Sequence, residues 1–258
     1  MQETSSTYKR LLADPGHWKE YSLVIGESGV LVTEKAEIIT FGGVSILIAS
    51  TGPESGFSEN KIISMETSKT IFSGSNPDVG NCVSGQITID MLKPKGEIPR
   101  RARLVPYVRL TNGKEHSEWI QKGVYFIDHR EYSGEENERM IISGYDGLIL
   151  TDGDFPSSTE TWPRKDIDVV RDIAKEIGAD VDSRTVAAMK NGYSINYPAE
   201  YSMREVLENI AAMYAGSFVM SDTGELLLVQ MFGIPKETNL LTDENGFVLT
   251  FGGDCILV

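Results

Sequence analysis

Short stretches in which apolar and polar residues alternate dominate the first 152 residues, and this pattern restricts the fold more than any other feature. It is clearest at residues 85–92, where Ile87, Ile89 and Met91 share one face of an extended strand. Comparable runs, bounded by turns rich in glycine, serine and proline, are found at 21–25, 38–49, 61–65, 103–110, 119–128 and 140–145. Such spacing is typical of a sandwich or a closed or nearly closed antiparallel barrel.

Single residues within these runs predict local irregularities. Pro106 cannot donate a ladder hydrogen bond, so it is expected at a sheet edge or a bulge. The glycine pair at 42–43 interrupts an apolar stretch and predicts a bulge or a turn. Gly80 and Gly123 are expected where a strand changes direction, because glycine adopts backbone conformations that other residues avoid.

The periodicity becomes helical after the first 152 residues. Apolar residues at 167, 170, 173, 174 and 177 form one stripe, and Gly178 is expected to end that helix. A second, short helix is predicted at 183–189. Ser202 and Glu205 have the spacing of a capping box, which predicts the start of a third helix ended by Gly216. The expected core positions of this third helix are Val206, Ile210 and Met213.

Strand-like runs return at 217–221 and 226–231 around a turn at 222–225, and again at 247–251 and 256–258. The predicted fold class is therefore mainly β with a helical insert (α+β). The expected division is an antiparallel β-barrel or sandwich domain at 1–152, a helical insert at 153–216, and strands of a second β domain, complete or truncated, at 217–258.

The charge balance argues against a protein that grips nucleic acid. Acidic residues number 38 against 24 basic ones, for a formal net charge of −14, whereas binding to phosphate backbones needs a basic patch. No apolar run approaches the roughly 20 residues that span a bilayer, and the first residues do not resemble a secretory signal. We expect a chain made in a cytoplasm, without a membrane anchor.

Motifs that carry chemistry are scarce. Cys82 and Cys255 are expected as free, packed thiols. The acidic stretch 152–154 resembles part of a calcium loop but lacks the later ligands, so a solvated junction is the expectation. His129 is expected on a sheet surface, and Trp119 and Tyr125 in the barrel core. The sequence therefore predicts no catalytic residue, no metal ligand and no cofactor.

Several stretches, taken in order from residue 7 to residue 231, resemble the tail-associated baseplate hub (tail-tip) proteins of phages and prophages of Gram-positive bacteria. They are Tyr8–Leu12, Trp18–Tyr21, Asn76–Val83, Ile98–Ala102, Trp119–Asp128, Ile142–Asp146, Tyr201–Val219 and Asp222–Leu226. The shared order of these stretches is more specific than any one of them. Members of the family usually continue beyond a segment like 250–254, whereas this chain stops at Val258.

The resemblance implies a structural protein of the virion tail, made in the host cytoplasm. Such hubs have two related β-barrel domains with a helical insert, and they form a threefold ring that continues the tail tube and lets DNA pass. The implied partners are further copies of the chain, as a trimer or a hexamer, and tail proteins such as the distal tail and tape-measure proteins. Sequence-specific binding of nucleic acid is not implied.

The segments most suited to contacts between subunits are the amphipathic stretch 6–14 and the polar loop 50–59. Their apolar members define the predicted interface residues, which are Tyr8, Leu11, Leu12 and Phe57. Within the structural class, the alternatives are a distal-tail ring protein and the hub of a contractile injection system. From other classes, the alternatives are a carbohydrate- or receptor-binding module using Trp119 and Trp162, and a tail-associated hydrolase.

Overall fold

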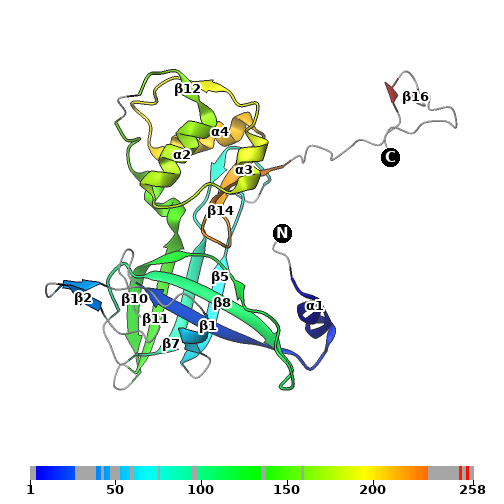
Figure 1. The fold of residues 1–258 in the computed structure, drawn as a ribbon, viewed down its shortest axis with the longest axis vertical. Coiled ribbons are helices and arrows are strands. Elements are labelled where there is room, and N and C mark those ends of the chain that lie inside the picture. The colour runs from blue at the N-terminus through cyan, green and yellow to red at the C-terminus, as the bar shows by residue number, and fades with distance from the viewer. Residues whose placement is uncertain are drawn as a thin grey trace.

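The chain forms two lobes, each built around its own hydrophobic core (Figure 1). The computed structural model describes residues 4–26, 39–41, 44–46, 53–58, 61–74, 76–94, 98–134, 138–157, 160–231, 250–251 and 254–255. The first lobe is an antiparallel sheet, and the second combines helices with a smaller sheet. The predicted α+β class, mainly β with a few helices, is confirmed.

The sheet of the first lobe has the strand order β4-β1-β8-β10-β11-β7-β5, with β9 pairing to β8. All of its neighbours are antiparallel. The strands are β1 (Trp18–Gly26), β4 (Phe57–Ser58), β5 (Ile62–Ser68), β7 (Gln86–Leu92), β8 (Arg103–Thr111), β9 (Ile120–Gln121), β10 (Tyr125–Ser133) and β11 (Arg139–Asp146). Apart from the run at 38–49, every run predicted as a strand in the first 152 residues overlaps one of them.

The alternation in sequence explains the first core. On β7, Ile87, Ile89 and Met91 are each at most 1% exposed, as their shared face predicted. Inward-facing residues of the other long strands complete this core, including Leu23, Met65, Leu104, Tyr125, Ile127, Met140 and Ile142. Because burying one large apolar side chain contributes about 1.5–3 kcal/mol, this shared face is the main source of the lobe's stability.

The described part of this sheet is not a closed barrel. The Lys61 N–H before β5 donates to the Ser58 carbonyl of β4 at 2.8 Å, but among the described residues no strand ladder links these two end strands. Strands β5 and β1 are in contact without a ladder, which leaves a split in the hydrogen bonding of the sheet, and β5 has β7 as its one strand neighbour in the same part of the chain. Of the barrel alternatives that the sequence left open, full closure is wrong.

Pro106 lies neither on an outer strand nor in a bulge, in contrast to the prediction. It sits within β8, opposite Leu23 of β1. On its other side, β8 pairs with β10 only up to Leu104 and with β9 from Tyr107 onward. The proline therefore occupies the gap between two neighbouring strands, where its missing N–H leaves no ladder bond unmade.

Two short hairpins lie apart from the lobes' main sheets (Figure 1). One pairs β2 (Ile39–Phe41) with β3 (Val44–Ile46). The glycine pair at 42–43, predicted as a bulge or a turn, lies outside the described residues. The other pairs β16 (Thr250–Phe251) with β17 (Asp254–Cys255). The strand predicted at 256–258 and most of the one at 247–251 lie outside the described residues.

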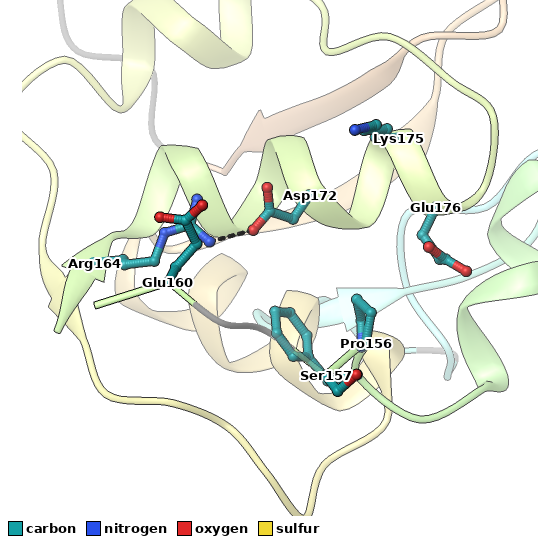
Figure 2. Close-up of a pocket in the computed structure, with 8 residues that line it drawn as sticks. Pro156, Ser157, Glu160, Arg164, Asp172, Lys175 and Glu176 are labelled. Atoms are coloured by element: carbon teal, nitrogen blue, oxygen red, sulfur yellow. Dashed lines mark hydrogen bonds and ion pairs between the residues drawn. The ribbon is translucent and has the colours of Figure 1, made fainter. Parts of the chain in front are cut away.

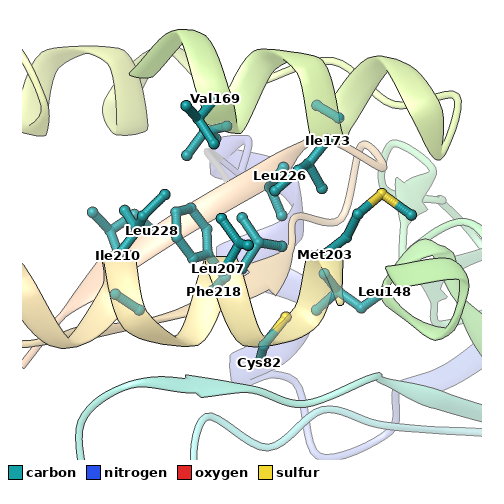
Figure 3. Packing of buried hydrophobic residues seen from close by; sticks show 14 of the residues in the cluster. Cys82, Leu148, Val169, Ile173, Met203, Leu207, Ile210, Phe218, Leu226 and Leu228 are labelled. Carbon is teal, nitrogen blue, oxygen red and sulfur yellow. The ribbon is translucent and has the colours of Figure 1, made fainter. Parts of the chain in front are cut away.

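The second lobe packs helices against a three-stranded sheet ordered β15-β14-β6. In Figure 3, side chains of α2, α4 and the sheet point toward one another, with Leu207 and Phe218 fully buried between them. Its elements are β6 (Asn81–Cys82), η2 (Gly147–Asp152), β12 (Arg164–Lys165), α2 (Asp166–Glu176), α3 (Ser183–Ala188), β13 (Ser194–Ile195), α4 (Met203–Met213), β14 (Gly216–Met220) and β15 (Leu226–Gln230). The three predicted helices and the predicted hairpin are confirmed.

The helix ends match the sequence signals, with two corrections in α4. Ser202 and Glu205 form the predicted capping box, and Gly178 follows α2 with a positive φ of 71°. However, α4 ends through Ala215, which has the positive φ of 47°, and not through Gly216. Met213 was also expected in the core but is 43% exposed, because it lies at the last turn of the helix.

Candidate functional site

The N-terminal helix α1 (Ser6–Ala13) lies against β8 of the first lobe (Figure 1). The Ser5 side chain caps it by accepting from the Tyr8 N–H at 3.0 Å. Leu11 is 1% exposed, whereas the neighbouring Leu12 is 55% exposed. Leu11 therefore fastens the helix to its own chain, and Leu12 is the apolar side chain that α1 presents outward.

Polar contacts fix α1 to the residues between β8 and β9. The Ser5 N–H donates to Glu118 Oε1 at 2.7 Å, and Arg10 forms an ion pair with Glu115. At the other end, Asn112 Nδ2 donates to the Asp14 carboxylate at 3.0 Å, which lowers the pKa of Asp14. Because these contacts hold both ends, α1 is an ordered part of the first lobe's surface.

Phe57, the fourth predicted interface residue, lies elsewhere on the lobe. It is half-buried on β4, opposite Leu23 of β1, and packs against the first core. Helix α1 instead precedes Trp18, where β1 begins. The strand between Trp18 and Leu23 spans roughly 17 Å at about 3.4 Å per residue. The structure therefore does not bring the four predicted residues into one cluster.

A groove of about 210 Å³ lies beside Phe57, between β1, β8 and residues 53–58. The Arg109 guanidinium stacks 4.3 Å from the Trp119 ring centre, and its Nε lies 2.5 Å from Glu20 Oε2. The Trp119 indole N–H donates to Glu54 Oε1 at 2.8 Å. Trp119 is thus a half-buried surface residue that helps to hold residues 53–58, and its predicted place in the core is wrong, whereas Tyr125 is fully buried as predicted.

The two lobes meet at a set of polar contacts that sequence reasoning missed. Asp146, 2% exposed at the end of β11, accepts from the Gly85 N–H at 2.7 Å and from the Leu148 N–H at 3.1 Å. Burial raises the pKa of Asp146 to about 6, although both N–H groups favour its charged form. The sequence could have shown that Asp146 caps the short helix η2, because aspartate is a common residue directly before a helix. Its hydrogen bond from the Gly85 N–H joins residues far apart in the chain and has no signature in sequence.

Arg204, at the start of α4, connects this helix to β6 and η2 within the second lobe. Its guanidinium donates to the carbonyls of Cys82 and Leu148, the latter at 2.8 Å, and pairs with Asp152 at 2.5 Å. Cys82 is buried and free, as predicted, and burial raises the pKa of its thiol to about 12. The side chain of Cys255 lies outside the described residues.

Lys69 and Asp222 form a second connection between the lobes. The Lys69 ammonium at the end of β5 lies 2.8 Å from Asp222 in the β14–β15 turn. The Gln121 amide donates to the Asp222 carbonyl at 2.8 Å. Gly224, with a φ of 88°, allows the same turn to approach Val124, because a Cβ there would lie 2.7 Å from that side chain.

A pocket of about 330 Å³ opens on the second lobe (Figure 2). Its walls are the segment after η2, the residues around β12 and the outward face of α2. They contribute Phe155, Pro156, Ser157, Glu160, Arg164, Asp172, Lys175 and Glu176. Arg164 and Asp172 form an ion pair at 2.5 Å across the pocket wall, drawn as a dashed line in Figure 2.

The remaining candidates for chemistry have ordinary surroundings. Asp152 of the acidic stretch forms an ion pair with Arg204. The backbone of Asp154 pairs with that of Ser202 in an isolated antiparallel β-bridge. Within the ranges that the structure describes, no group of three His, Cys, Asp or Glu residues is arranged to hold a metal ion. His129 is exposed on β10, next to a bulge. The helices of the described ranges include none with the length and apolar character needed to cross a bilayer.

Comparison with known proteins gives similarity of fold only. No family model and no curated protein matches the chain. Among solved structures, the 43 kDa tail protein of prophage MuSo2 from Shewanella oneidensis is similar at 13% identity and a TM-score of 0.47, over 83% of this chain and 56% of that one. A tail protein from Neisseria meningitidis MC58 is similar at 12% identity and a TM-score of 0.42, over 81% of this chain and 50% of that one. The chain thus spans about half the length of each.

Proposed function

We propose that the protein is a structural, non-enzymatic component of a phage or prophage tail, at the baseplate hub or tail tip. The observation that carries this proposal is the packing of the stretches that resemble hub proteins. Two of them, 76–83 and 201–219, are distant in sequence but form one unit. The Gly80 N–H donates to the Gly216 carbonyl at 2.8 Å, and β6 pairs in parallel with β14.

The fit between these two stretches is close enough to require particular residues. Gly80 has a φ of 80°, and a Cβ there would lie 3.1 Å from both the Ala212 Cβ and the Glu208 carbonyl oxygen. Arg204 in the second stretch donates to the Cys82 carbonyl in the first. The coincidence of the resembling stretches with one packed unit of the fold supports the proposal.

Assembly into a ring is proposed to use the split in the first sheet and helix α1. Among the residues that the structure describes, β1 beyond its short pairing with β4 and the outer side of β5 have no ladder partner, and unpaired strand edges invite pairing with another chain. Head-to-tail contacts of this kind generate closed rings when the rotation between subunits allows closure. Tyr8 and Leu12 on α1, and Phe57 on β4, are the proposed apolar contacts. A net charge of −14 agrees with a lumen past which DNA slides.

The proposed partners are further copies of the chain and neighbouring proteins of the tail, such as the distal tail and tape-measure proteins. The divisions at 152/153 and 216/217 remain a proposal for domain boundaries, with the helices before 217 and β14–β15 after it sharing one core. Both proposals depend on the resemblance of the ordered stretches to hub proteins.

Solution mass and electron microscopy test the proposal. Light scattering over a wide concentration range is expected to give three times the chain mass of 28.5 kDa, and negative-stain images are expected to contain rings with an open centre. A hexamer would favour the distal-tail ring or injection-system alternative. A monomer at all concentrations, without rings, would contradict self-assembly.

A matched pair of substitutions localises the contact. Leu12→Asp places a charge on the exposed face of α1 and is expected to lower the oligomeric mass without unfolding the lobe. Leu150→Asp makes the same change at a leucine of similar exposure, 44% against 55%, on the other lobe and is the control. Leu11→Asp is unsuitable, because Leu11 is buried in its own chain. Equal masses for the wild type and both variants would contradict a contact through α1.

A further inference from the structure

We propose that the pocket on the second lobe binds a neutral saccharide. Its volume of about 330 Å³ falls at the lower end of the roughly 300–1,000 Å³ typical of small-molecule sites. The pocket lies far in sequence from the residues of the proposed subunit contacts, and a saccharide site there is independent of the hub role. Three features support it: the charges around the pocket, the rigidity of its wall and the aromatic cluster that adjoins it.

The charges around the pocket are of both signs. Glu160, Asp172 and Glu176 supply carboxylates, while Arg164 and Lys175 supply donors. Three of these residues lie on α2 at positions i, i+3 and i+4, so they share one face of the helix. An anion would meet the three carboxylates, and a cation would meet the guanidinium and the ammonium. A hydroxyl group both donates and accepts, so a neutral ligand rich in hydroxyls can satisfy groups of both kinds.

The wall of the pocket is held in place before any ligand arrives. The Arg164 side chain is 17% exposed, is paired to Asp172 at 2.5 Å, and lies 5.4 Å from the centre of the Trp162 ring. A guanidinium fixed on two sides retains further N–H donors in a defined plane. Preorganised groups lose little entropy on binding, which favours affinity for small polar ligands.

An aromatic cluster adjoins the pocket through Phe155 and extends beyond it. Phe155, which lines the pocket, packs edge-to-face against Trp162 and Tyr197, with ring centres 6.2 and 6.1 Å away. Tyr197 is 38% exposed, so the cluster reaches the surface. Aromatic rings provide apolar area for the C–H faces of a sugar, while the tyrosine hydroxyl provides a polar group.

The test is binding of defined sugars to the full chain. The probes are lactose, maltose and N,N′-diacetylchitobiose, with sialyllactose as an anionic probe and spermidine as a cationic one, measured by saturation-transfer NMR and calorimetry. At least one neutral disaccharide is expected to bind with a Kd of about 1 mM or tighter. No binding of any neutral probe at tenfold higher concentration would overturn the proposal, and so would tighter binding of sialyllactose or spermidine.

Two variants place the binding in this pocket. The double variant Lys175→Met, Glu176→Gln changes exposed side chains of the pocket and is expected to weaken binding at least tenfold. The control is Arg171→Met, on the same helix but outside the pocket lining, which is expected to leave the Kd unchanged. Thermal unfolding of each variant verifies its fold. Equal affinity of the double variant and the wild type would assign the sugar to another site and refute the proposal.

Discussion

The two lobes differ in where they place charged residues. Apart from the junction acid Asp146, the first lobe keeps its charged side chains at or near the surface, where Arg10 fastens α1 through Glu115 and Arg109 joins β8 to β1 through Glu20. In the second lobe, an acid is taken fully inside. Asp166 is 0% exposed and accepts from the N–H groups of Ile167 and Tyr193 at 2.7 and 2.9 Å.

The surface ion pairs hold peripheral segments in place, whereas the buried acid holds the interior of its lobe together. Exposed ion pairs contribute about 0–1 kcal/mol each, so the first lobe can lose a peripheral contact without losing its fold. A buried carboxylate instead requires all of its hydrogen bonds, because an unpaired one costs about 1–3 kcal/mol or more. The first lobe is therefore suited to presenting segments to neighbours, and the second to holding a pocket of fixed shape.

The largest expected effect comes from one cavity in each core. Ile89→Ala and Leu207→Ala both remove fully buried side chains, and each is expected to lower the free energy of unfolding by about 2–5 kcal/mol. Because the junction couples the lobes, both variants are expected to unfold in a single transition. Urea unfolding followed by tryptophan fluorescence and circular dichroism measures this. Two separated transitions would show that the lobes are stable independently.

The next effect depends on pH and concerns the buried junction acid. Since the pKa of Asp146 is about 6 when folded, against an ordinary value of 3.8, the folded state binds its proton more tightly. The stabilisation from protonated Asp146 is thus fully present below about pH 4. It is lost as the pH rises through 6, which lowers the free energy of unfolding by about 3 kcal/mol. In Asp146→Asn, this part of the pH dependence is expected to disappear. Parallel profiles of unfolding free energy from pH 4 to 7 would refute the assignment.

Arg204→Ala is expected to cost about 2–3 kcal/mol, because it leaves the carbonyls of Cys82 and Leu148 without a charged donor. Arg171→Ala is the matched control, since Arg171 is 52% exposed and forms an ion pair only one helical turn away, with Asp168. Chemical denaturation of the two variants gives the comparison. A cost for Arg204→Ala no larger than that of the control would mean that this guanidinium does not fasten α4 to β6 and η2.

The smallest expected effect comes from replacing two glycines that have a positive φ, one in close contact with its surroundings and one not. Gly80 and Gly178 have similar positive φ values of 80° and 71°, but a Cβ added at Gly80 would meet atoms within 4 Å, whereas one at Gly178 would meet none. Gly178→Ala is expected to cost about 1 kcal/mol from backbone strain alone. Gly80→Ala is expected to cost about 1 kcal/mol more, because β6 must move away from α4. Thermal unfolding compares them, and equal costs would argue against tight packing at this point.

Much of the fold could be predicted because its signals are local. Alternation identified the inner face of β7, and the capping residue Ser202 identified the start of α4. The end of α4 was misassigned because glycine has more than one use. At Gly216 a Cβ would lie 2.6 Å from the Val229 carbonyl oxygen, so this glycine permits close strand pairing instead of ending the helix.

The candidate sites depended on contacts that no local pattern reveals. Leu11 and Leu12 are adjacent and equally apolar, yet only the packing of α1 on β8 decides which one is exposed. Arg204 binds two backbone carbonyls, and every residue has a carbonyl, so its partners carry no signature in sequence. The pocket likewise forms only when α2 and β12 are side by side.

The parallel pairing of β6 with β14 has a consequence for how the chain is made. Asn81 leaves the ribosome early, but its strand partner Ser217 follows only much later in synthesis. At about 5–20 residues per second, the early strand waits on the order of ten seconds for its neighbour. Until then Cys82, which is 2% exposed in the folded protein, is expected to be accessible to thiol reagents. Labelling of nascent chains at this cysteine would therefore time the moment at which the core of the second lobe forms.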